Sequence, residues 1–274
     1  MPLAATLLCA ALLAGASTPK DPATPDEPDD AERAREPAGG TGVSPVELIP
    51  RLELRQVYTR APGGVSVHDT IVEMDIEFLK RIMLRYQLPA RLMESPAGQV
   101  SGIGDIQIGL VAVLGSTPRF VAALLGGAVL NSATEPKLGE GRTQVMAGAG
   151  AAYKPYPWWL AYGVAQEQLS VGSANGRPDV NQLMADAGSI LFGRQFNWLK
   201  IDLQTTVDFP GGATGRLYGM AEAGSLVIGR VGLFMRLGTQ LAGPRLVDLN
   251  LAAGVRYLFR LETRKGAPPS SQSW

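Results

Sequence analysis

Charged side chains at every second position are the residues of this chain best placed to do chemistry. Glu73, Asp75 and Glu77 alternate with apolar residues in the stretch Thr70–Phe78, and Arg55 lies in the stretch before it. An extended strand points such residues to one face, and opposite charges on neighbouring strands can form ion pairs. These pairs could hold a protein wall together, or opposed acidic and basic strips could orient a polar solute. The sequence leaves both interpretations open.

A serine and the only histidine are the residues that a hydrolytic reaction could use. Ser66 lies two residues before His68, so the two could share a strand face. Such a nucleophile needs a base and a third group that orients the base, and no third group can be named here. The only cysteine, Cys9, lies in the N-terminal apolar run, so the rest of the chain has no thiol. We therefore expect no enzyme activity, no cofactor and no metal site, and keep a membrane hydrolase using His68 as a remote alternative.

Twelve stretches with a period of two residues fill the chain between Arg51 and Phe259. In the stretch Leu199–Asp208, for example, apolar residues alternate with Lys200 and Asp202. A helix would distribute such charges around its circumference, whereas a strand keeps them on one face. The stretches are therefore expected to be β-strands.

The turns between these stretches come in two sizes. Short joints such as Gly229-Arg230 alternate with longer loops, most of them rich in Gly, Pro, Ser and Asn. An even number of strands with this alternation is the layout of an outer-membrane barrel. A soluble β-sandwich or lipocalin-like barrel is the alternative, but the apolar faces carry very few charges, which favours lipid. The predicted fold is all-β: a single closed antiparallel transmembrane β-barrel of about twelve strands in up-and-down order, with short periplasmic turns and longer extracellular loops.

The polar faces of the strands would then line the lumen. Unpaired charge in a narrow barrel is costly, so the inward charges are expected to pair across strands. Side chains can fill the lumen of a barrel of roughly eight strands, whereas a barrel of roughly sixteen strands has an open channel. Twelve strands lie between these sizes, so the width of the barrel alone does not decide between a filled and an open interior. The predicted lumen-lining charges are Glu53, Arg55, Glu73, Asp75, Glu77, Arg81, Arg85, Asp105, Asp186, Lys200, Asp202, Asp208, Glu222, Arg236, Asp248 and Arg256.

Aromatic residues gather near the short turns. A belt of aromatic rings at headgroup depth is typical of membrane barrels. The last strand alternates as far as Tyr257 and Phe259, which resembles the terminal strand that barrel-assembly machinery recognises, although fifteen further residues follow it. The expected interfacial girdle consists of Phe78, Phe120, Tyr153, Tyr156, Trp158, Trp159, Phe192, Phe196, Trp198, Tyr257 and Phe259.

The two ends of the chain differ in composition from the rest. Residues 1–16 are apolar and end in Ala-Gly-Ala, the small-residue pattern of a secretory signal peptide, which we favour over a buried N-terminal helix. Residues 17–47 are acidic and rich in proline, so they are expected to form a disordered periplasmic leader. Residues 48–260 would form the outer-membrane barrel and residues 261–274 a flexible C-terminal tail.

Composition excludes two other classes. Basic and acidic residues are equal in number, at 25 each, so no overall positive charge points to nucleic acid. The longest apolar run after the N-terminal segment is Phe120–Leu130, far shorter than the roughly 20 residues of a spanning helix. The expected location is the outer membrane of a Gram-negative type of cell, after secretion to the periplasm.

Two glycine-rich motifs lie about thirty residues apart, as Gly102-Ile103-Gly104-Asp105 and as Leu138-Gly139-Glu140-Gly141. Glycines at a strand start relax the backbone and Asp105 could cap a turn, so the first motif has a purely structural explanation. A nucleotide-binding interpretation fails, because the segment does not lie between a strand and a helix.

Over roughly residues 100–260 the two motifs resemble a bacterial family of outer-membrane transporters associated with phenol and aromatic-compound degradation. The Pro-Thr-Gly loop of that family is absent here, where Leu130-Asn131-Ser132 stands. The resemblance implies an outer-membrane barrel but does not indicate a substrate.

The expected function is therefore passive passage of a small solute through the lumen. The loops around Arg91–Val100 and Asn131–Gly141 are the expected gates. The leading alternative is a structural or adhesive barrel whose lumen is plugged by its own charges. The expected partners are outer-membrane lipid, the barrel-assembly machinery and the solute.

Overall fold

A computed structural model describes residues 48–171, 179–193, 197–210 and 212–259. The predicted signal peptide, leader and C-terminal tail lie outside these ranges. In the described ranges thirteen strands join into one antiparallel sheet, with a 3-10 turn, η1 (Pro62–Gly64), after the first strand. The strands are β1 (Arg51–Ala61), β2 (Val65–Leu79), β3 (Ile82–Ser95), β4 (Gly98–Ile103), β5 (Gln107–Thr117), β6 (Phe120–Val129), β7 (Thr143–Tyr156), β8 (Trp159–Val171), β9 (Asn181–Phe192), β10 (Asn197–Asp208), β11 (Thr214–Ile228), β12 (Val231–Ala242) and β13 (Leu249–Leu258).

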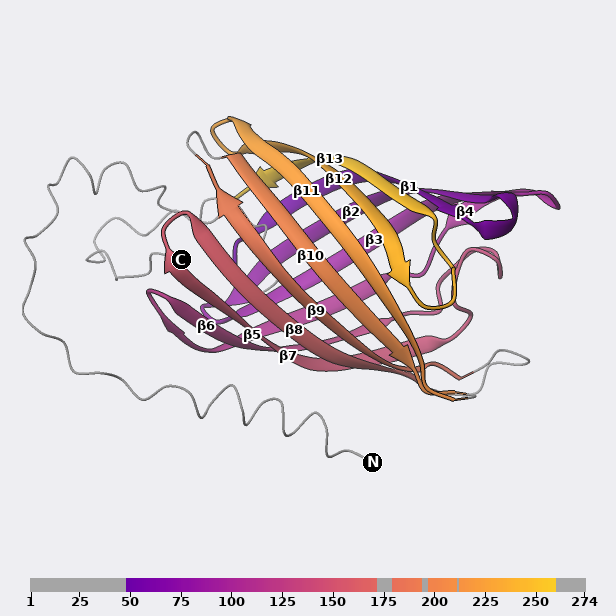
Figure 1. Ribbon diagram of the computed structural model, residues 1–274, viewed down its shortest axis with the longest axis horizontal. Helices are drawn as coiled ribbons and strands as arrows, with labels where there is room; N and C mark the ends of the chain where they lie inside the picture. The colour runs from indigo at the N-terminus through magenta and orange to yellow at the C-terminus, as the bar shows by residue number, and fades with distance from the viewer. Residues whose placement is uncertain (1–47, 172–178, 194–196, 211, 260–274) are drawn as a thin grey trace, which may run out of the picture. The chain divides into compact units, whose positions relative to one another are not determined.

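The sheet closes on itself through its first and last strands. β1 pairs with β13 on one edge and with β2 on the other, so that Glu53 lies opposite both Arg256 and Glu73. Each remaining strand pairs with its neighbours in chain order, apart from the additional strand β4 (Figure 1). Closure leaves no open seam, which hydrocarbon would not tolerate. The prediction of a closed antiparallel barrel of about twelve strands is confirmed.

One predicted strand is divided in two. The stretch Ser101–Leu114 forms the end of β4 and most of β5, because β3 pairs with β5 only as far as Gln87 and with β4 from Ala90 onward. Pro89 lies at the change of partner and has no N–H to donate to a ladder. Its carbonyl oxygen accepts a hydrogen bond of 2.9 Å from the N–H of Gly104.

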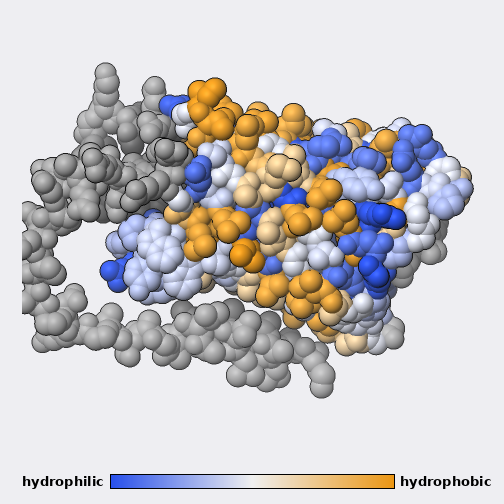
Figure 2. Space-filling model, turned by 45° about the horizontal axis from the view of Figure 1, so that its top comes forward, coloured by the Kyte–Doolittle hydropathy of each residue, from blue (hydrophilic) through white to orange (hydrophobic). Residues whose placement is uncertain are grey.

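The outer face of the wall is apolar. Leu54, Val72, Leu203 and Leu251 point outward, and each is exposed by about 40 to 50%. Hydrophobic side chains cover the middle of the barrel surface, while hydrophilic ones gather at the end where β4 lies (Figure 2). A soluble barrel would bury these side chains, so the soluble alternatives are wrong.

The interior has two layers. Near the short turns, which we call the short-turn end, inward side chains from eight strands form a dry apolar layer, and Leu48 from the segment before β1 packs against it. Towards the opposite loop end, the inward side chains are polar and partly exposed. The dry layer consists of Met83, Val111, Val121, Ala123, Ala152, Leu160, Tyr162, Ile190, Trp198 and Phe234.

Within the described ranges, no helix is both long enough and apolar enough to cross a membrane.

Candidate functional site

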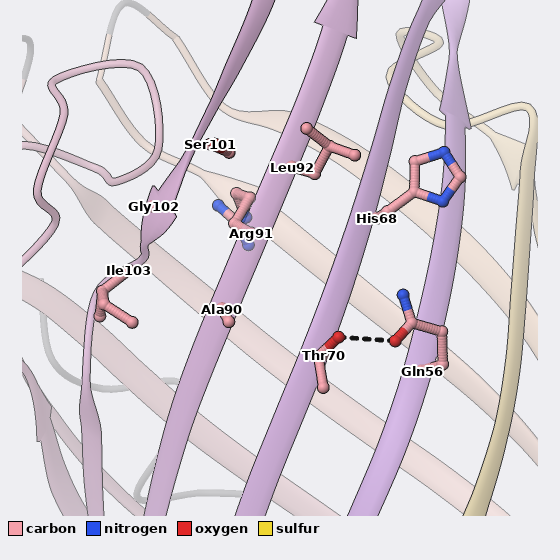
Figure 3. A pocket seen from close by; sticks show the side chains of 9 residues that line it. All are labelled: Gln56, His68, Thr70, Ala90, Arg91, Leu92, Ser101, Gly102 and Ile103. Carbon is pink, nitrogen blue, oxygen red and sulfur yellow. Dashed lines mark hydrogen bonds between the residues drawn. The ribbon is translucent and has the colours of Figure 1, made fainter.

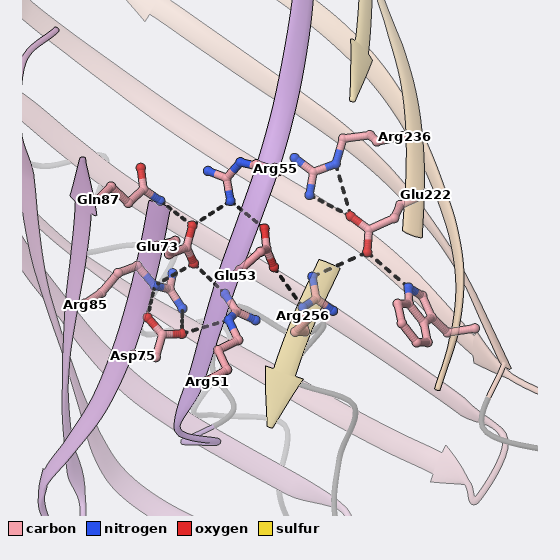
Figure 4. A network of polar contacts seen from close by, with 11 residues as sticks. Arg51, Glu53, Arg55, Glu73, Asp75, Arg85, Gln87, Glu222, Arg236 and Arg256 are labelled. Atoms are coloured by element: carbon pink, nitrogen blue, oxygen red, sulfur yellow. Dashed lines mark hydrogen bonds and ion pairs between the residues drawn. The ribbon is translucent and has the colours of Figure 1, made fainter. Parts of the chain in front are cut away.

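The inward charges of the first two strands form the centre of a continuous ion-pair network (Figure 4). The Glu73 carboxylate accepts hydrogen bonds from Arg51 at 2.6 Å, from Arg55 at 2.7 Å and from the Gln87 amide at 2.6 Å. Strand register explains why these side chains lie together, because Glu73 lies opposite Glu53 on β1 and opposite Gln87 on β3. Three donors from two neighbouring strands therefore surround one buried carboxylate.

Asp75 extends the network towards the short-turn end. Arg85 on β3 lies opposite Asp75 and donates to both carboxylate oxygens, at 2.8 and 3.0 Å. Arg51 Nε also lies 3.1 Å from Asp75, so Arg51 bridges the two carboxylates of β2. The forked geometry of arginine suits such two-point contacts.

The other half of the network lies across the seam that closes the barrel. Arg256 on β13 donates to Glu53 at 2.8 Å and lies 3.7 Å from Glu222 on β11. Glu222 in turn accepts from Arg236 at 2.6 Å and from the indole N–H of Trp198 at 3.0 Å.

Aromatic rings support the Arg256 guanidinium. Its central carbon lies 4.9 Å from the ring centre of Phe234 and 5.5 Å from that of Trp198. Guanidinium groups are attracted to aromatic faces, most strongly where water is excluded. The dry layer and the charged network are therefore in direct contact.

Charge compensation is nearly complete in this part of the lumen. Five guanidinium groups face four carboxylates in the network, and the adjoining Lys200 ammonium lies 3.0 Å from Asp202. Buried charges are tolerated when they are paired and hydrogen-bonded, and removal of one partner is costly. Asp202 also accepts from the hydroxyl of Tyr162, a residue of the dry layer.

Most of the predicted lumen charges lie on the inner face, and most of these belong to the network or adjoin it. Asp186 also faces inward from β9, half-buried, and one of its oxygens has no partner among the described residues. Glu77 is half-buried towards the short-turn end, opposite Met83. Asp208 pairs with Arg216 at 2.5 Å near the loop end.

Three predicted lumen charges have other positions. Arg81 is exposed in the turn between β2 and β3, because the turn falls at Lys80-Arg81 and β3 begins one residue later. Asp248 precedes β13 on the rim and pairs with the exposed Arg245 at 2.6 Å. Asp105 lies in the break between β4 and β5, where it binds a loop and borders a small cavity between that loop and the strands.

Two predicted girdle residues point inward instead. The Trp198 side chain is 3% exposed, and Phe192 packs against the dry layer. Trp198 shares the parity of Lys200 on β10, and Phe192 shares that of Asp186 on β9. On each of these two strands, the side chain of the lumen charge and that of the aromatic residue therefore point to the same face. Phe196 lies outside the described residues.

The remaining predicted aromatics gather at the short-turn end. Tyr156 and Trp158 stack with their ring centres 5.4 Å apart, and Trp159 donates from its indole N–H to Ser189 at 2.7 Å. Most of these rings are strongly exposed, as interfacial aromatics are. The exposed members are Phe78, Phe120, Tyr153, Tyr156, Trp158, Tyr257 and Phe259.

Arg51 and Gln87 are network residues that the sequence analysis missed. Arg51 has the same parity as Glu53 and Arg55, so the alternation that identified those two residues also identifies Arg51. Gln87 is uncharged and gives no comparable signal. Only its position opposite Glu73 reveals it, and that position depends on strand register.

The two glycine-rich motifs meet at one point of the wall. The Asp105 carboxylate accepts backbone N–H groups from Ser132 at 3.2 Å, Ala133 at 3.1 Å and Glu140 at 2.6 Å. Gly139 lies against the same carboxylate, because a Cβ there would be 2.5 Å from Asp105 Oδ1. Asp105 thus fastens the loop between β6 and β7 at both of its ends.

The fastened loop closes a gap in the wall at the loop end. β6 ends at Val129. One edge of β4 pairs with β3, and its other edge contacts the loop at Thr134, because no strand in the described residues pairs with it there. Leu138 in this loop is fully buried, and its carbonyl oxygen accepts from Arg91 at 3.0 Å. Of the two expected gates, Asn131–Gly141 is a loop, whereas Arg91–Val100 is largely the β3–β4 hairpin.

A small polar cavity lies between this loop and the strands. Its volume is about 100 Å³, and Gln87 connects it to the network through the hydrogen bond to Glu73. Arg91, which also borders it, donates to both oxygens of Asp69 at 2.7 and 3.0 Å. The cavity therefore lies on the inner face, between the charged network and the loop end of the barrel.

His68 lies on the outer face, away from the lumen. Its ring centre is 5.0 Å from that of Tyr58, and its imidazole makes no side-chain hydrogen bond to a described serine. Ser66 instead donates to Glu94 at 3.3 Å. This arrangement does not activate a nucleophile. No group of three or more His, Cys, Asp or Glu in the described residues is arranged to hold a metal ion.

No protein-family model matches the chain, and no curated protein matches it in sequence. Among solved structures, the fold is similar to that of an outer-membrane channel from Pseudomonas putida F1, with a TM-score of 0.61 and 14% identity over 79% of this chain and 100% of that one. It is also similar to the NanC porin (TM-score 0.58, 6% identity, 77% and 100% coverage) and to the KdgM porin (0.50, 8%, 77% and 99%). None of these comparisons bears on phenol degradation. The apolar outer wall and the shared fold are those of a β-barrel of the Gram-negative outer membrane.

Proposed function

We propose that the barrel is a channel through which a small polar solute crosses the outer membrane. The observation that carries this proposal is the water exposure of inward polar side chains above the dry layer. The side chains of Arg85 and Arg236 are 22 and 24% exposed, although both point into the barrel. Side chains on the inner face can meet water only through the lumen, so that part of the lumen contains space for solvent.

Two groups of polar side chains on the inner wall offer hydrogen bonds to this space. Gln182 donates to Gln168 at 2.7 Å, and Gln168 donates to Gln144, so three amides form a chain across β9, β8 and β7. The arginine-rich network lies on another part of the wall, with its charged side chains on β1–β3 and β11–β13. Such a lining suits a hydrated solute that exchanges water for amide and guanidinium contacts. The fold likeness to structures described as a channel and as porins supports the same function.

The dry layer would be the narrow part of the path. Met83 and Ile190 are fully buried and Leu160 is 1% exposed, so water does not reach these inward side chains. Apolar constrictions can stop water and ions without a physical plug. In this proposal the described conformation is closed at the short-turn end, which faces the periplasm, and passage requires the layer to move apart.

A plugged structural barrel is the second candidate, and the same dry layer favours it. If the layer never opens, the ion pairs and the apolar residues together only fill and stiffen the wall. Export by a signal peptide at residues 1–16, assembly through β13 and a disordered leader at residues 17–47 belong to either proposal.

Single-channel recording separates the two candidates. The refolded full chain would be inserted into a planar bilayer in a symmetrical salt solution, with an empty detergent control. A channel gives discrete conductance steps, and larger solutes such as oligosaccharides should reduce them. A barrel that inserts, as judged by protease protection, but gives no steps over a range of voltages would contradict the channel and support the plugged barrel.

A further inference from the structure

The outer face of β1–β4 has a groove that channel function does not use (Figure 3). Its volume is about 530 Å³, and it opens on the same side of the wall as the lipid-facing leucines. Strand parity fixes this side: Gln56 follows Leu54 by two residues on β1, and Thr70 precedes Val72 by two on β2. The groove is lined mainly by Gln56, His68, Thr70, Leu92, Ser101 and Ile103.

The groove is continuous with the surface that contacts lipid. Leu54 and Val72, directly below Gln56 and Thr70 on their strands, are 50 and 39% exposed apolar side chains of the outer wall. Above them the outward residues become polar, towards the end of the barrel that carries the loops. A molecule in the groove would therefore have acyl chains beside Leu54 and Val72 and its polar part beside Gln56 and His68.

The polar side chains of the groove other than Arg91 have hydrogen-bonding capacity to spare. Thr70 donates to the side-chain oxygen of Gln56 at 2.6 Å, which leaves the Gln56 NH₂ group directed outward. Neither His68 nor the Ser101 hydroxyl makes a side-chain hydrogen bond to another described residue. The one charged residue at the groove, Arg91, is already bound to Asp69 and Leu138 on the inner face. Among the lining residues, no guanidinium or ammonium group is therefore left unpaired for a phosphate group.

Ring and aliphatic surfaces complete the lining. His68 contributes an aromatic ring, which is tilted against the ring of Tyr58, and Leu92 and Ile103 form apolar parts of the lining. Sugars present hydroxyl groups at their edges and C–H groups on their faces, so amide, hydroxyl and aromatic side chains together match them. We propose that this groove binds the sugar headgroup of a glycolipid in the outer leaflet of the membrane.

The single histidine of the chain gives a direct test. The full chain, without a histidine tag, would be placed in phosphatidylcholine nanodiscs, and the imidazole NMR signals of His68 followed as a glycosyl diacylglycerol with matched acyl chains is added. A saturable shift is expected with the glycolipid. Phosphatidylethanolamine of the same chain length, which also carries hydrogen-bond donors, should leave the signals unchanged. Equal shifts with both lipids, or no shift with the glycolipid, would overturn the proposal.

Two variants make the assignment specific. Gln56→Ala combined with Ser101→Ala should weaken glycolipid binding about tenfold, which corresponds to the loss of one or two net hydrogen bonds. Thr205→Ala, which removes an exposed outward hydroxyl from β10 on another part of the wall, should leave binding unchanged. Saturation by soluble methyl glucoside at the same concentrations would show that the site takes free sugars, and would overturn the lipid assignment. The test is independent of conductance, so it can succeed or fail whether or not the barrel is a channel.

Discussion

The Asp105 carboxylate accepts the backbone N–H of Glu140 at 2.6 Å, across 35 residues of sequence. The same carboxylate holds the other end of the loop through Ser132 and Ala133. Backbone N–H groups bound to a charged acceptor are among the stronger protein hydrogen bonds. One side chain therefore keeps a whole loop in the wall of the barrel.

Replacement of Asp105 by Asn should release this loop. Asn has one acceptor oxygen, and its NH₂ group would face the N–H of Glu140, so the fastening at one end of the loop is lost at a cost of about 1 to 3 kcal/mol. The exposed Lys137 should then be cut by trypsin roughly ten times faster than in the unchanged protein. Cleavage after Arg245, which is 74% exposed on another loop, serves as the internal reference and should not change. Equal cleavage of Lys137 in the two proteins would show that Asp105 does not hold the loop.

Replacement of Glu53 by Gln should destabilise the barrel strongly. Glu53 accepts from Arg55 at 2.6 Å and from Arg256 at 2.8 Å, and Arg256 is 2% exposed. Removing the carboxylate takes the 2.8 Å ion pair from that buried cation, which costs about 3 to 5 kcal/mol. Urea-induced unfolding from phospholipid vesicles measures this difference.

Asp248→Asn is the matched control for Glu53→Gln. Its partner Arg245 is exposed on the rim, and an exposed pair contributes about 1 kcal/mol or less. A similar loss of stability in the two variants would mean that the network around Glu53 is no better protected from water than the rim.

The alternation of side chains made the barrel predictable from the sequence. A period of two residues assigns each side chain to one face, and closure requires the two faces to be lipid and lumen. The same rule places Glu73, Asp75 and Arg85 together once β2 and β3 are taken as a hairpin. It also places Trp198 inside, because Trp198 and Lys200 have the same parity. The error over Trp198 came from weighing residue type above parity.

Long-range features could not be predicted in this way. The division between β4 and β5 depends on which strand Pro89 lies against, and that is set by register rather than by local pattern. Asp105 and Gly139 belong to motifs that the sequence shows plainly. Their contact, however, requires a loop to fold back onto the wall. Alternation within one strand carries no information about such contacts.

Replacement of Ile190 by Ala should widen the dry layer. Ile190 is fully buried on the inner face of β9, so the change removes packed volume and should cost about 2 to 5 kcal/mol of stability. If the layer is the constriction, single-channel conductance should rise as well. Leu191→Ala, one residue further on the lipid face, is the control and should leave conductance unchanged. Higher conductance in the Leu191 variant alone would contradict the assignment of the two faces.

Replacement of Arg85 by Gln should shift the ion preference of the channel towards cations. Arg85 is the partly exposed lumen partner of Asp75 and also lies 3.5 Å from Glu73, so its loss removes one positive charge from beside these two carboxylates and makes the inner wall more negative than before. The reversal potential in a potassium chloride gradient measures this preference. Because the network is nearly balanced in charge, the unchanged channel should discriminate only weakly.

Arg81→Gln provides the comparison, since it removes the same charge from the same hairpin. Arg81 is exposed in the turn between β2 and β3, outside the network, and salt screens charges at such positions within about 10 Å. The reversal potential of the Arg81→Gln variant should therefore match that of the unchanged protein. Equal shifts for Arg81 and Arg85 would mean that the potential at the short-turn mouth, rather than the network inside the lumen, selects the ions.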